Sequence, residues 1–563
     1  MIGFLGCTGA GKSSLINALL EEVDCLPADD EKACTAVCVE ISWNTSDDPS
    51  KKYLAEIERI SADDWRVELE KLFADISDQV SNKDSEAGEF DLERDMRIKS
   101  AFQKLKCVYS HIKSQKDLSA HTVASLMQDG TVKNILGKST TISFDNLDDF
   151  AADIKPYIDS SNSQEEGGRS FAQWPLVKVV RLYLKSEILK NGIVLVDLPG
   201  SLDTNAARGA IAEKYQKNLS VTCVVAPTAR AASDKPAQDL LGKVTQLRLQ
   251  LDNQFNSDHL AFVVTKTDSS LSLGRYIKTH ANLQDLLAPV FQKEEKLKSY
   301  LLMAEMKRDQ QNKLEADLRA EIKEHSNACK GLENSIKNMM ITRGAWVESN
   351  GKRKRDETAA KSEPSPKEKD MMAEHKEFKK EIENLGKQVA NAHQSAYRQE
   401  HFIKHIENAL LFQESKKQGA AIQNRNKIST NELRKDFKSA ARQIGQELGD
   451  KELQVFCVSA LVFNEFLQHR PKTSGFQKPG DTGIPALQSW LIQITLPTRS
   501  RNALSFLEDI VSLELSMKPW VEDSAVEFKM DPDQGARMGK VFASCITTLK
   551  EVCFTFYLDE YQS

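Results

Sequence analysis

The stretch Gly6-Cys7-Thr8-Gly9-Ala10-Gly11-Lys12-Ser13 has the form G-x-x-x-x-G-K-S, and it decides the fold class of this chain. The form is typical of a loop that connects a strand to a helix around nucleotide phosphates. Backbone N–H groups in such a glycine-rich turn converge on the phosphate oxygens. The flanks agree, because Ile2 to Leu5 are apolar and strand-like, and Ser14 to Leu20 begin an amphipathic helix.

The residues of this loop have different expected roles. We expect Lys12 to reach the β- and γ-phosphates and the Ser13 hydroxyl to bind Mg²⁺. The remaining nucleotide contacts are expected from Gly6, Thr8, Gly9, Ala10, Gly11 and Ser14.

A second motif, Asp197-Leu198-Pro199-Gly200, has the form D-x-x-G and ends a short apolar run that begins at Ile193. Asp197 is expected to approach Mg²⁺ through water, and the Gly200 N–H to bind the γ-phosphate. The segment after Gly200 would therefore sense hydrolysis. Ser201 stands where a small GTPase has a glutamine, so positioning of water by that side chain is not expected.

A third motif, Thr265-Lys266-Thr267-Asp268, follows the strand-like run 260–264 and predicts which base is bound. We expect Thr265, Lys266 and Asp268 to contact the nucleotide. The Asp268 carboxylate can accept two N–H bonds from guanine, whereas adenine presents a lone pair at the first position and lacks the second donor. Losing two charge-assisted bonds costs roughly 3 to 6 kcal/mol, which is on the order of 10² to 10⁴ in affinity. The three motifs together predict a site for GTP and GDP, with GTP as substrate and Mg²⁺ as cofactor.

These motifs resemble those of the dynamin superfamily of large GTPases. Leu26-Pro27 followed by Ala33-Cys34-Thr35 is similar to the first switch of that superfamily, which implies that Thr35 binds Mg²⁺ and the γ-phosphate. Thr265 occupies the position that is Asn in small GTPases, as in dynamins. The dynamin loop normally has Gln and Ser at Thr8 and Gly9, so its charge-compensating cation is in question here.

Two further stretches extend the resemblance. Val224-Val225-Ala226-Pro227 leading to Ser233-Asp234-Lys235 is similar to a dynamin segment that contributes to contacts across a GTPase dimer. Ser459-Ala460, at the end of a β-rich run from Leu453, looks like the fifth GTPase motif, in which the N–H at Ala460 donates to guanine O6. A plain core strand is the alternative for that run.

A closer resemblance, over most of the chain, is to the group that includes the nuclear GTPase SLIP-GC. It is carried by residues 9–18, by Trp174-Pro175-Leu176 and by residues 203–208. This resemblance implies GTP binding and hydrolysis. Dynamin relatives carry a helix before the first strand, whereas Met1 here stands just before that strand, so the chain either dispenses with the helix or is a shortened sequence.

Composition limits the partners. With 563 residues, of which 28% are charged and 40% hydrophobic, the chain is too long for one core. A net charge of -6 makes nucleic acid an unexpected partner. Ten scattered cysteines suit a reducing compartment, and no apolar run is long enough for a transmembrane segment. We therefore expect a nuclear or cytoplasmic protein.

The predicted fold class is α/β: a P-loop GTPase domain with a mostly parallel sheet, flanking helices and large helical insertions. We expect the GTPase core at 1–45 and 173–282, with a return strand at 449–480. A helical insertion is expected at 46–172, a coiled-coil-like helical hairpin at 283–448 and a C-terminal helical region at 481–563.

Within the insertion, Tyr53–Ile60 and Trp65–Phe73 both show apolar residues at helical spacing. Residues 176–184 are expected to return to the sheet. Asn191-Gly192 is a hairpin-turn signal that would set this strand antiparallel to the one bearing Asp197.

Each arm of the expected hairpin has an apolar edge. The first is spaced by Leu314, Leu318 and Ile322, and the second carries a heptad seam at Phe378, Ile382, Leu385 and Val389. The polar break 349–370 is expected to be disordered. Its basic run 351–355 is either a solvated tip or a nuclear localisation signal.

These expectations combine into a dynamin-like GTPase that hydrolyses GTP to GDP and phosphate. Because a catalytic glutamine is missing, we expect slow basal turnover that dimerisation or higher homo-oligomerisation through the GTPase face stimulates. Arg208 and Arg230 are candidates for a catalytic arginine by position only. The alternatives are a GTP-binding scaffold with little hydrolysis, which acts on a protein partner through its hairpin, and a membrane-remodelling dynamin.

Overall fold

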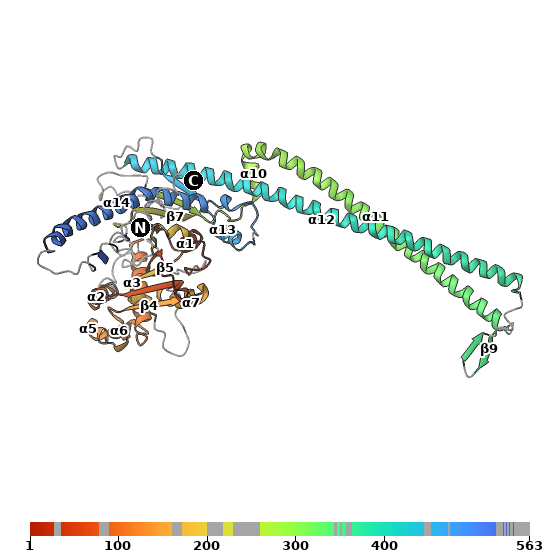
Figure 1. The fold of residues 1–563 in the computed structure, drawn as a ribbon, viewed down its shortest axis with the longest axis horizontal. Helices are drawn as coiled ribbons and strands as arrows, with labels where there is room; N and C mark the ends of the chain where they lie inside the picture. The colour runs from red at the N-terminus through yellow and green to blue at the C-terminus, as the bar shows by residue number, and fades with distance from the viewer. Residues whose placement is uncertain are drawn as a thin grey trace.

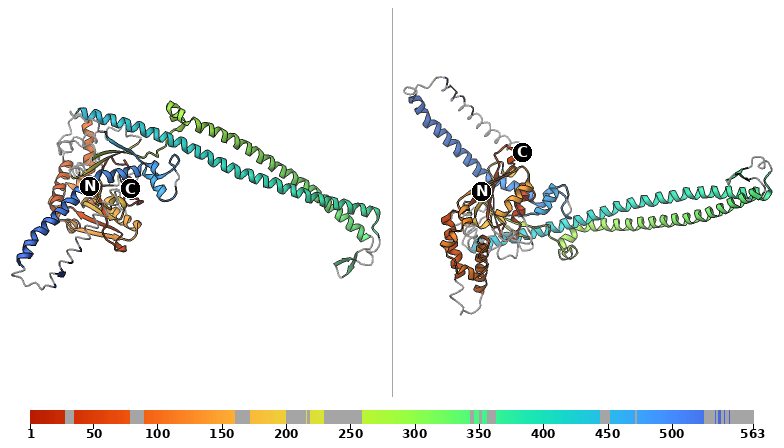
Figure 2. Two further views of the ribbon diagram at one scale, coloured as in Figure 1. Left: turned by 45° about the horizontal axis from the view of Figure 1, so that its top comes forward. Right: turned by 90° about the horizontal axis from the view of Figure 1, so that it is seen from below.

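A layered α/β body carries a long helical hairpin that projects far beyond it (Figure 1). The computed structural model describes residues 1–27, 35–77, 89–159, 172–199, 218–228, 259–342, 346–349, 352–355, 363–443, 452–470 and 473–524, together with Tyr215 and a few single residues after 524. Two further views show that the hairpin and the last long helix leave the body in different directions (Figure 2).

The described residues form a nine-stranded sheet in the order β11-β8-β7-β1-β6-β2-β5-β3-β4. Its first five strands in that order are parallel and nearly all apolar, as expected for strands that are buried on both faces. They are β11 (Gln454–Cys457), β8 (Leu260–Thr265), β7 (Val221–Pro227), β1 (Ile2–Leu5) and β6 (Leu195–Asp197). This arrangement confirms the predicted fold class.

The other strands extend the sheet with mixed directions. β2 is antiparallel to β6 and parallel to β5, and β3 is antiparallel to both β5 and β4. Their bounds are β2 (Cys38–Trp43), β5 (Val177–Leu184), β3 (Tyr53–Arg59) and β4 (Ser139–Phe144).

Strand β3 corrects the prediction that Tyr53–Ile60 is helical. Tyr53, Ala55 and Ile57 are buried, and the residues between them are only partly buried, which is the period of a strand. The apolar residues of this segment fit both the spacing of a helix and the alternation of a strand. The strand forms because β5 and β4 provide hydrogen-bonding partners on both sides.

The turn Asn191-Gly192 does not form a hairpin between β5 and β6. The two strands run in opposite directions, but β2 lies between them in the sheet. The connection contains a 3₁₀ helix, η3 (Glu187–Leu189), and Gly192 adopts a φ of 79°. Because this connection is longer than a tight turn, it can cross over β2.

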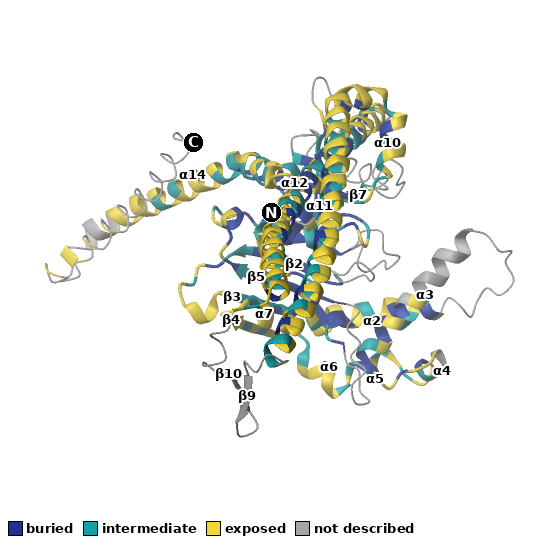
Figure 3. Cartoon of the chain, turned by 90° about the vertical axis from the view of Figure 1, so that its right-hand side faces the viewer, coloured by how far each residue is buried: buried dark blue, intermediate teal, exposed yellow. Residues whose placement is uncertain are grey.

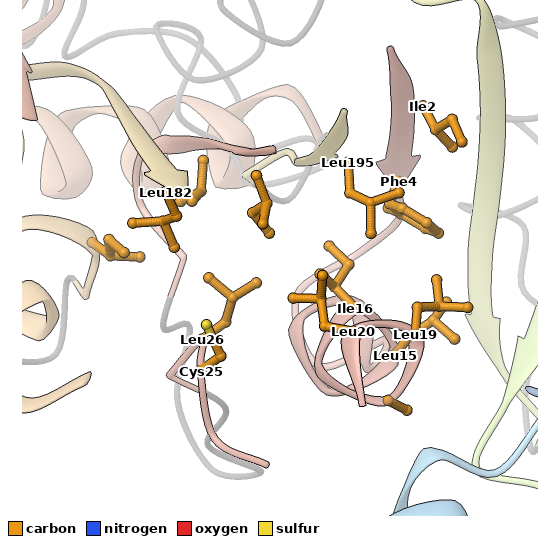
Figure 4. Close-up of a cluster of buried hydrophobic side chains, with 14 of the residues drawn as sticks. Ile2, Phe4, Leu15, Ile16, Leu19, Leu20, Cys25, Leu26, Leu182 and Leu195 are labelled. Atoms are coloured by element: carbon orange, nitrogen blue, oxygen red, sulfur yellow. The ribbon is translucent and has the colours of Figure 1, made fainter. Parts of the chain in front are cut away.

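The helix α1 (Lys12–Leu20) packs its apolar side chains against the sheet. Figure 4 shows Ile16 and Leu20 of α1 near Leu195 and Phe4 of the strands. The same core includes residues of α13 (Ala460–Leu467) and of the first turns of α14 (Ile484–Ser524). The Gln488 side chain donates to the Leu19 carbonyl at 3.0 Å, so α14 begins on the α/β body.

The insertion has a core of its own around Trp65. The indole N–H of Trp65 donates to the Tyr109 hydroxyl at 3.1 Å, and both side chains are buried. Trp65–Phe73 is helical, as predicted. The helices here are α2 (Ala62–Ser77), α3 (Glu89–Val108), α4 (Gln115–Leu118), α5 (Val123–Met127), α6 (Gly130–Ile135) and α7 (Leu147–Ile158). Short 3₁₀ helices occur at η1 (Pro49–Lys51), η2 (Trp174–Leu176) and η6 (Pro479–Thr482).

The hairpin consists of α11 (Ala281–Thr342) and α12 (Pro366–Gln443), which α10 (Leu273–Thr279) precedes. The two arms lie side by side in all views (Figures 1 and 2). The predicted seam on α12 is confirmed, since Leu385 is buried and its three partners are partly buried. On α11, Leu318 is buried, but Leu314 is 46% exposed, so Leu314 is not part of the inner edge.

Ion pairs also join the two arms. Lys417 of α12 lies 2.9 Å from Glu294 of α11, and Arg308 of α11 lies 3.2 Å from Glu400 of α12. The Lys417 and Glu294 side chains are both largely shielded from solvent, so this pair links the arms near the body.

The hairpin tip corrects part of the prediction that 349–370 is disordered. β9 (Trp346–Ser349) pairs antiparallel with β10 (Lys352–Arg355), and α12 begins at Pro366. A sequence signal accounts for the start of α12. Ser365 forms a capping box with Glu368, with bonds of 3.3 Å in both directions.

The outer faces of the hairpin and most of α14 are exposed (Figure 3). On α14 the exposed side chains include large apolar ones such as Leu504, Phe506 and Leu513. No helix in the described ranges combines the length and the hydropathy that crossing a membrane requires.

Candidate nucleotide-binding site

The predicted motifs meet at one edge of the sheet, where the parallel strands end. β1 leads into the loop 6–13, β6 ends at Asp197, β8 ends at Thr265 and β11 is followed closely by Ser459. Ligands of α/β proteins bind at this edge, because loops from neighbouring strands converge there. The topology thus brings together segments that lie up to hundreds of residues apart in the sequence.

The loop 6–13 depends on its glycines. Gly9 and Gly11 have φ values of 75° and 84°, which L side chains rarely adopt. A Cβ atom on Gly6 would lie 2.3 Å from the Val225 carbonyl oxygen of β7, so a larger residue would displace backbone. Gly11 caps α1 without a side-chain hydrogen bond, and Thr8 and Gly9 are exposed.

Lys12 lies across this loop. Its Nζ donates to the carbonyl oxygens of Gly6 at 3.0 Å and Cys7 at 3.3 Å, and the side chain is buried. Its positive charge therefore adds to the partial positive charge at the N-terminus of α1, where Ser14 lies in the first turn. A helix start of this kind favours a phosphate group.

Three oxygens converge beside Lys12. The Ser13 hydroxyl donates to Asp197 Oδ2 at 2.7 Å, the Thr35 hydroxyl donates to the same oxygen at 3.2 Å, and the two hydroxyls are 3.0 Å apart. These are the three residues that the sequence assigns to Mg²⁺.

Asp197 is buried, and burial raises the pKa of its carboxyl group. The charge of Lys12 and the bonds from Ser13 and Thr35 oppose this shift. Its second oxygen, Oδ1, is buried and has no hydrogen-bond partner among the described residues. A buried carboxylate oxygen beside two hydroxyls is an all-oxygen donor set that fits a hard cation such as Mg²⁺.

The position of Thr35 depends on the insertion. Thr35 forms an isolated β-bridge with Asp159, at the end of α7, and the Ala36 N–H donates to the Ile158 carbonyl at 2.9 Å. Asn17 of α1 holds the preceding segment by exchanging bonds of 2.9 and 2.8 Å with the Leu26 backbone. Sequence reasoning did not find Asp159 or Asn17, because neither belongs to a local motif.

The Thr265 side chain, expected from the sequence to contact the nucleotide, instead forms a contact within the protein. Its side chain is buried and donates to the Ala10 carbonyl at 2.6 Å, so it ties the base loop to the phosphate loop. Lys266 follows with a φ of 56°, and its Cε lies 3.9 Å from a Cβ built on Gly11. Thr265 thus fixes the distance between the two ends of the site.

Asp268 and Ser459 lie together. Ser459 Oγ donates to Asp268 Oδ1 at 2.5 Å, and its own N–H donates to the Thr482 carbonyl at 2.9 Å. Ser459 also caps α13, in which Ala460 is the first residue. Ser459 therefore orients the carboxylate of Asp268. The contact of Ala460 with guanine stays a prediction.

Arg425 is a residue of this site that sequence reasoning missed. It lies on α12, and its guanidinium donates to the carbonyl oxygens of Thr267 at 2.5 Å and Ser269 at 3.3 Å. The sequence around it is one of many Lys- and Arg-rich turns of a long helix, so no local signal could have found it.

Several predicted residues lie outside the described ranges. They are Ala33, Cys34, Gly200, Ser201, the stretch 203–208 with Arg208, Arg230 and the stretch 233–235. Their roles remain expectations from the sequence.

Comparisons with known proteins agree with this geometry. Residues 2–267 match the sequence profile of the dynamin family. The chain is 32% identical over 279 residues to the nuclear GTPase SLIP-GC of Mus musculus and 29% identical over 281 residues to that of Homo sapiens. Both alignments cover 49% of this chain and 33% of the relative, so the match spans about a third of the length of these relatives.

A solved structure is also similar. It is described as an oligomerised bacterial dynamin pair that provides a mechanism for long-range sensing and tethering of membranes. Sequence identity to it is 15%, with a TM-score of 0.29 over 73% of this chain and 72% of that one. A TM-score this low does not establish a common arrangement. The profile match and the two curated relatives confirm the resemblance of residues 2–267 to the dynamin superfamily, and this part of the chain is a dynamin-like GTPase domain.

Proposed function

We propose that this chain binds GTP together with Mg²⁺ and hydrolyses it to GDP and phosphate. The observation that carries the proposal is the convergence of Ser13, Thr35 and Asp197 beside Lys12, with one buried Asp197 oxygen that has no hydrogen-bond partner among the described residues. An all-oxygen site next to a phosphate-binding helix start is the arrangement that Mg²⁺–nucleotide complexes require.

The residues of the chain have separate roles in this proposal. Lys12 and the backbone N–H groups at the start of α1 hold the β- and γ-phosphates and neutralise charge that develops on them. Ser13 and Thr35 would hold Mg²⁺ directly, and Asp197 would hold it through water. When bound, Mg²⁺ neutralises charge on the transferred phosphoryl group. The Thr35 segment orients the attacking water.

The base is selected at the other end of the site. Asp268, oriented by Ser459, accepts two N–H bonds from guanine, and the Ala460 N–H donates to its O6. Adenine presents a lone pair and a C–H group at these two positions, so both charge-assisted bonds are lost and the binding of ATP is disfavoured.

Turnover is slow in the isolated chain and rises when two GTPase faces meet. Two features of the sequence support this. Ser201 replaces a water-positioning glutamine, and the stretches 224–227 and 233–235 resemble a dynamin segment that contributes to contacts across a GTPase dimer. A second copy of this chain is thus the proposed partner.

The test measures product formation from purified full-length protein. Chromatography of nucleotides after incubation with GTP and Mg²⁺ should show GDP, and turnover per molecule should rise across a series of protein concentrations. Flat turnover across that series would contradict stimulation by dimerisation. Tight GTP binding with no GDP formed would instead support a scaffold that acts through its hairpin.

We also propose that the protein resides in the nucleus. Both curated relatives are named nuclear GTPases, and the basic run Lys352–Arg355 lies at the far end of the hairpin. A fluorescent fusion should accumulate in nuclei, and replacement of the four basic residues by Ala should leave it cytoplasmic. Nuclear accumulation of both proteins would contradict the assignment of that run.

A further inference from the structure

The hairpin reaches the base loop through Arg425. Both terminal nitrogens of its guanidinium are used: one donates to the Thr267 carbonyl at 2.5 Å, and the other to the carbonyl and hydroxyl oxygens of Ser269 at 3.3 and 3.4 Å. Thr267 and Ser269 are the two chain neighbours of Asp268. One side chain of α12 therefore holds the backbone on both sides of the carboxylate that reads guanine.

This loop needs an external support. Lys266, two residues before Asp268, adopts the left-handed region with a φ of 56°, which is unfavourable for a residue with a side chain. The described contacts that hold the loop in place include those of Thr265 at its start, the bond from the Thr267 N–H to the Val458 carbonyl at 3.3 Å, and the bonds of Ser459 to Asp268 and of Arg425 to the carbonyls. Burial lowers the pKa of the Arg425 guanidinium, and Tyr276, Cys457 and Asp268 oppose that shift.

The part of α12 that carries Arg425 is fixed to the body. Before it, a Cβ on Gly419 would lie 2.6 Å from the Gly475 carbonyl oxygen, so helix and loop are in close contact. After it, Leu433 and Phe437 are buried in a core that includes Phe262 of β8. Asn424 contacts the Tyr276 hydroxyl of α10 at 3.3 Å.

The same helix continues without a break to the hairpin tip. The chain enters the hairpin just after Asp268 and leaves it just before Ser459, so the two residues that meet at the base lie at the two ends of the inserted segment. A change in the direction of α12 would therefore move Arg425 and both ends of the base site together.

We infer that Arg425 is a positioning residue for guanine and that it couples the hairpin to the base end of the site. The inference rests on the proposed function, because it concerns regulation of the same GTP site. Coupling of this kind is reciprocal: if the hairpin affects how guanine is held, then bound guanine affects the hairpin.

The test compares GTP with ITP, whose base lacks the exocyclic amine and so gives Asp268 only one donor. Calorimetry on the full chain with Mg²⁺ should show GTP binding roughly tenfold or more tightly than ITP, because one charge-assisted bond distinguishes them. Arg425→Ala should bring the two affinities together, mainly by weakening GTP. Arg425→Lys should restore only part of the ratio, since an ammonium group cannot span both carbonyls.

Arg434→Ala is the matched control. Arg434 lies on the same helix, donates to the Leu453 carbonyl at 3.2 Å and pairs with Glu452 at 3.1 Å, away from Asp268. Its loss should leave the ratio of GTP to ITP affinity unchanged. A merely structural role of Arg425 would weaken both nucleotides equally, and an unchanged ratio in Arg425→Ala would overturn the inference.

Two further outcomes are separable. If the wild-type chain binds neither nucleotide, the proposed function fails, whereas a wild-type preference that survives in Arg425→Ala refutes only this inference. Should the Ala variant not fold, Arg425→Gln gives the same readout, because one amide donor cannot hold both carbonyls. Hydrogen exchange at saturating GTP should show protection of α12 near residues 419–430 in the wild type and not in Arg425→Ala; equal protection in both would contradict the coupling.

Discussion

The phosphate end and the base end of the site are held in different ways. At the phosphate end, Lys12, Ser13 and Asp197 follow two adjacent parallel strands, and their contacts are made within the body. At the base end, Asp268 depends on Ser459, which follows the hairpin, and on Arg425, which belongs to it. We therefore expect phosphate binding to depend on the body, including its helical insertion, and guanine binding to depend on the hairpin as well.

The largest effect is expected from Lys12→Ala at the phosphate end. Loss of a buried charge that serves every nucleotide should weaken GTP, ITP and ATP alike, by about 3 to 5 kcal/mol, or on the order of 10² to 10³ in Kd. Calorimetry checks this, with Lys298→Ala on the exposed face of α11 as the control. Retained GTP affinity in Lys12→Ala would refute the assignment of the phosphate loop.

The second effect separates the two ends. Asp268→Ala should remove both bonds to guanine and weaken GTP by roughly 3 to 6 kcal/mol, while ATP affinity stays as it is in the wild type. Asp285→Ala, an exposed position on α11, serves as the control. An equal loss of affinity for GTP and for ATP would mean that the phosphate end and the base end do not act independently, which contradicts the comparison between them.

The third prediction compares the end of α12 that packs on the sheet with the seam between the two arms of the hairpin. Phe437, at that end of α12, is buried with residues of the sheet, so Phe437→Ala should destabilise the body by about 3 to 5 kcal/mol. Ile382→Ala, in the seam between the arms, should leave unfolding of the body unchanged. Denaturant titration, with hydrogen exchange as the readout for each part of the chain, measures how each variant changes the unfolding of the body. Equal destabilisation of the body by both variants would contradict the prediction that the arms are independent of it.

The smallest effect concerns Asp197 without nucleotide or Mg²⁺. Because burial raises its pKa, the folded state binds this proton more tightly than the unfolded state, so stability falls as pH rises through the raised pKa. Asp197→Asn removes the buried charge and should melt higher at neutral pH, by about 2 to 4 °C for each kcal/mol. Thermal melting at several pH values should show the gap closing in acid; a gap that does not change with pH would count against this reading.

The phosphate end could be predicted from the sequence because its signals are local. Each motif directly follows a short apolar run, and such runs become adjacent parallel strands in this fold class. The sequence could not predict Arg425 or Asp159, since each contacts residues more than a hundred positions away and neither stands in a recognisable pattern.

The errors in the predicted fold have physical causes. Tyr53–Arg59 satisfies a helical and a strand period at once, and only the partners β5 and β4 decide between them. The polarity of the segment 349–370 predicts disorder, although the capping box at Ser365 is a local signal for a helix start.

The central claim is that one guanine nucleotide is held at both ends of this site. Calorimetric titration of the full-length chain with GTP and with ATP, in the presence of Mg²⁺, tests it most directly. We predict that GTP binds more tightly, on the order of 10² to 10⁴. Equal affinity for ATP, or no binding of either nucleotide, would contradict the claim.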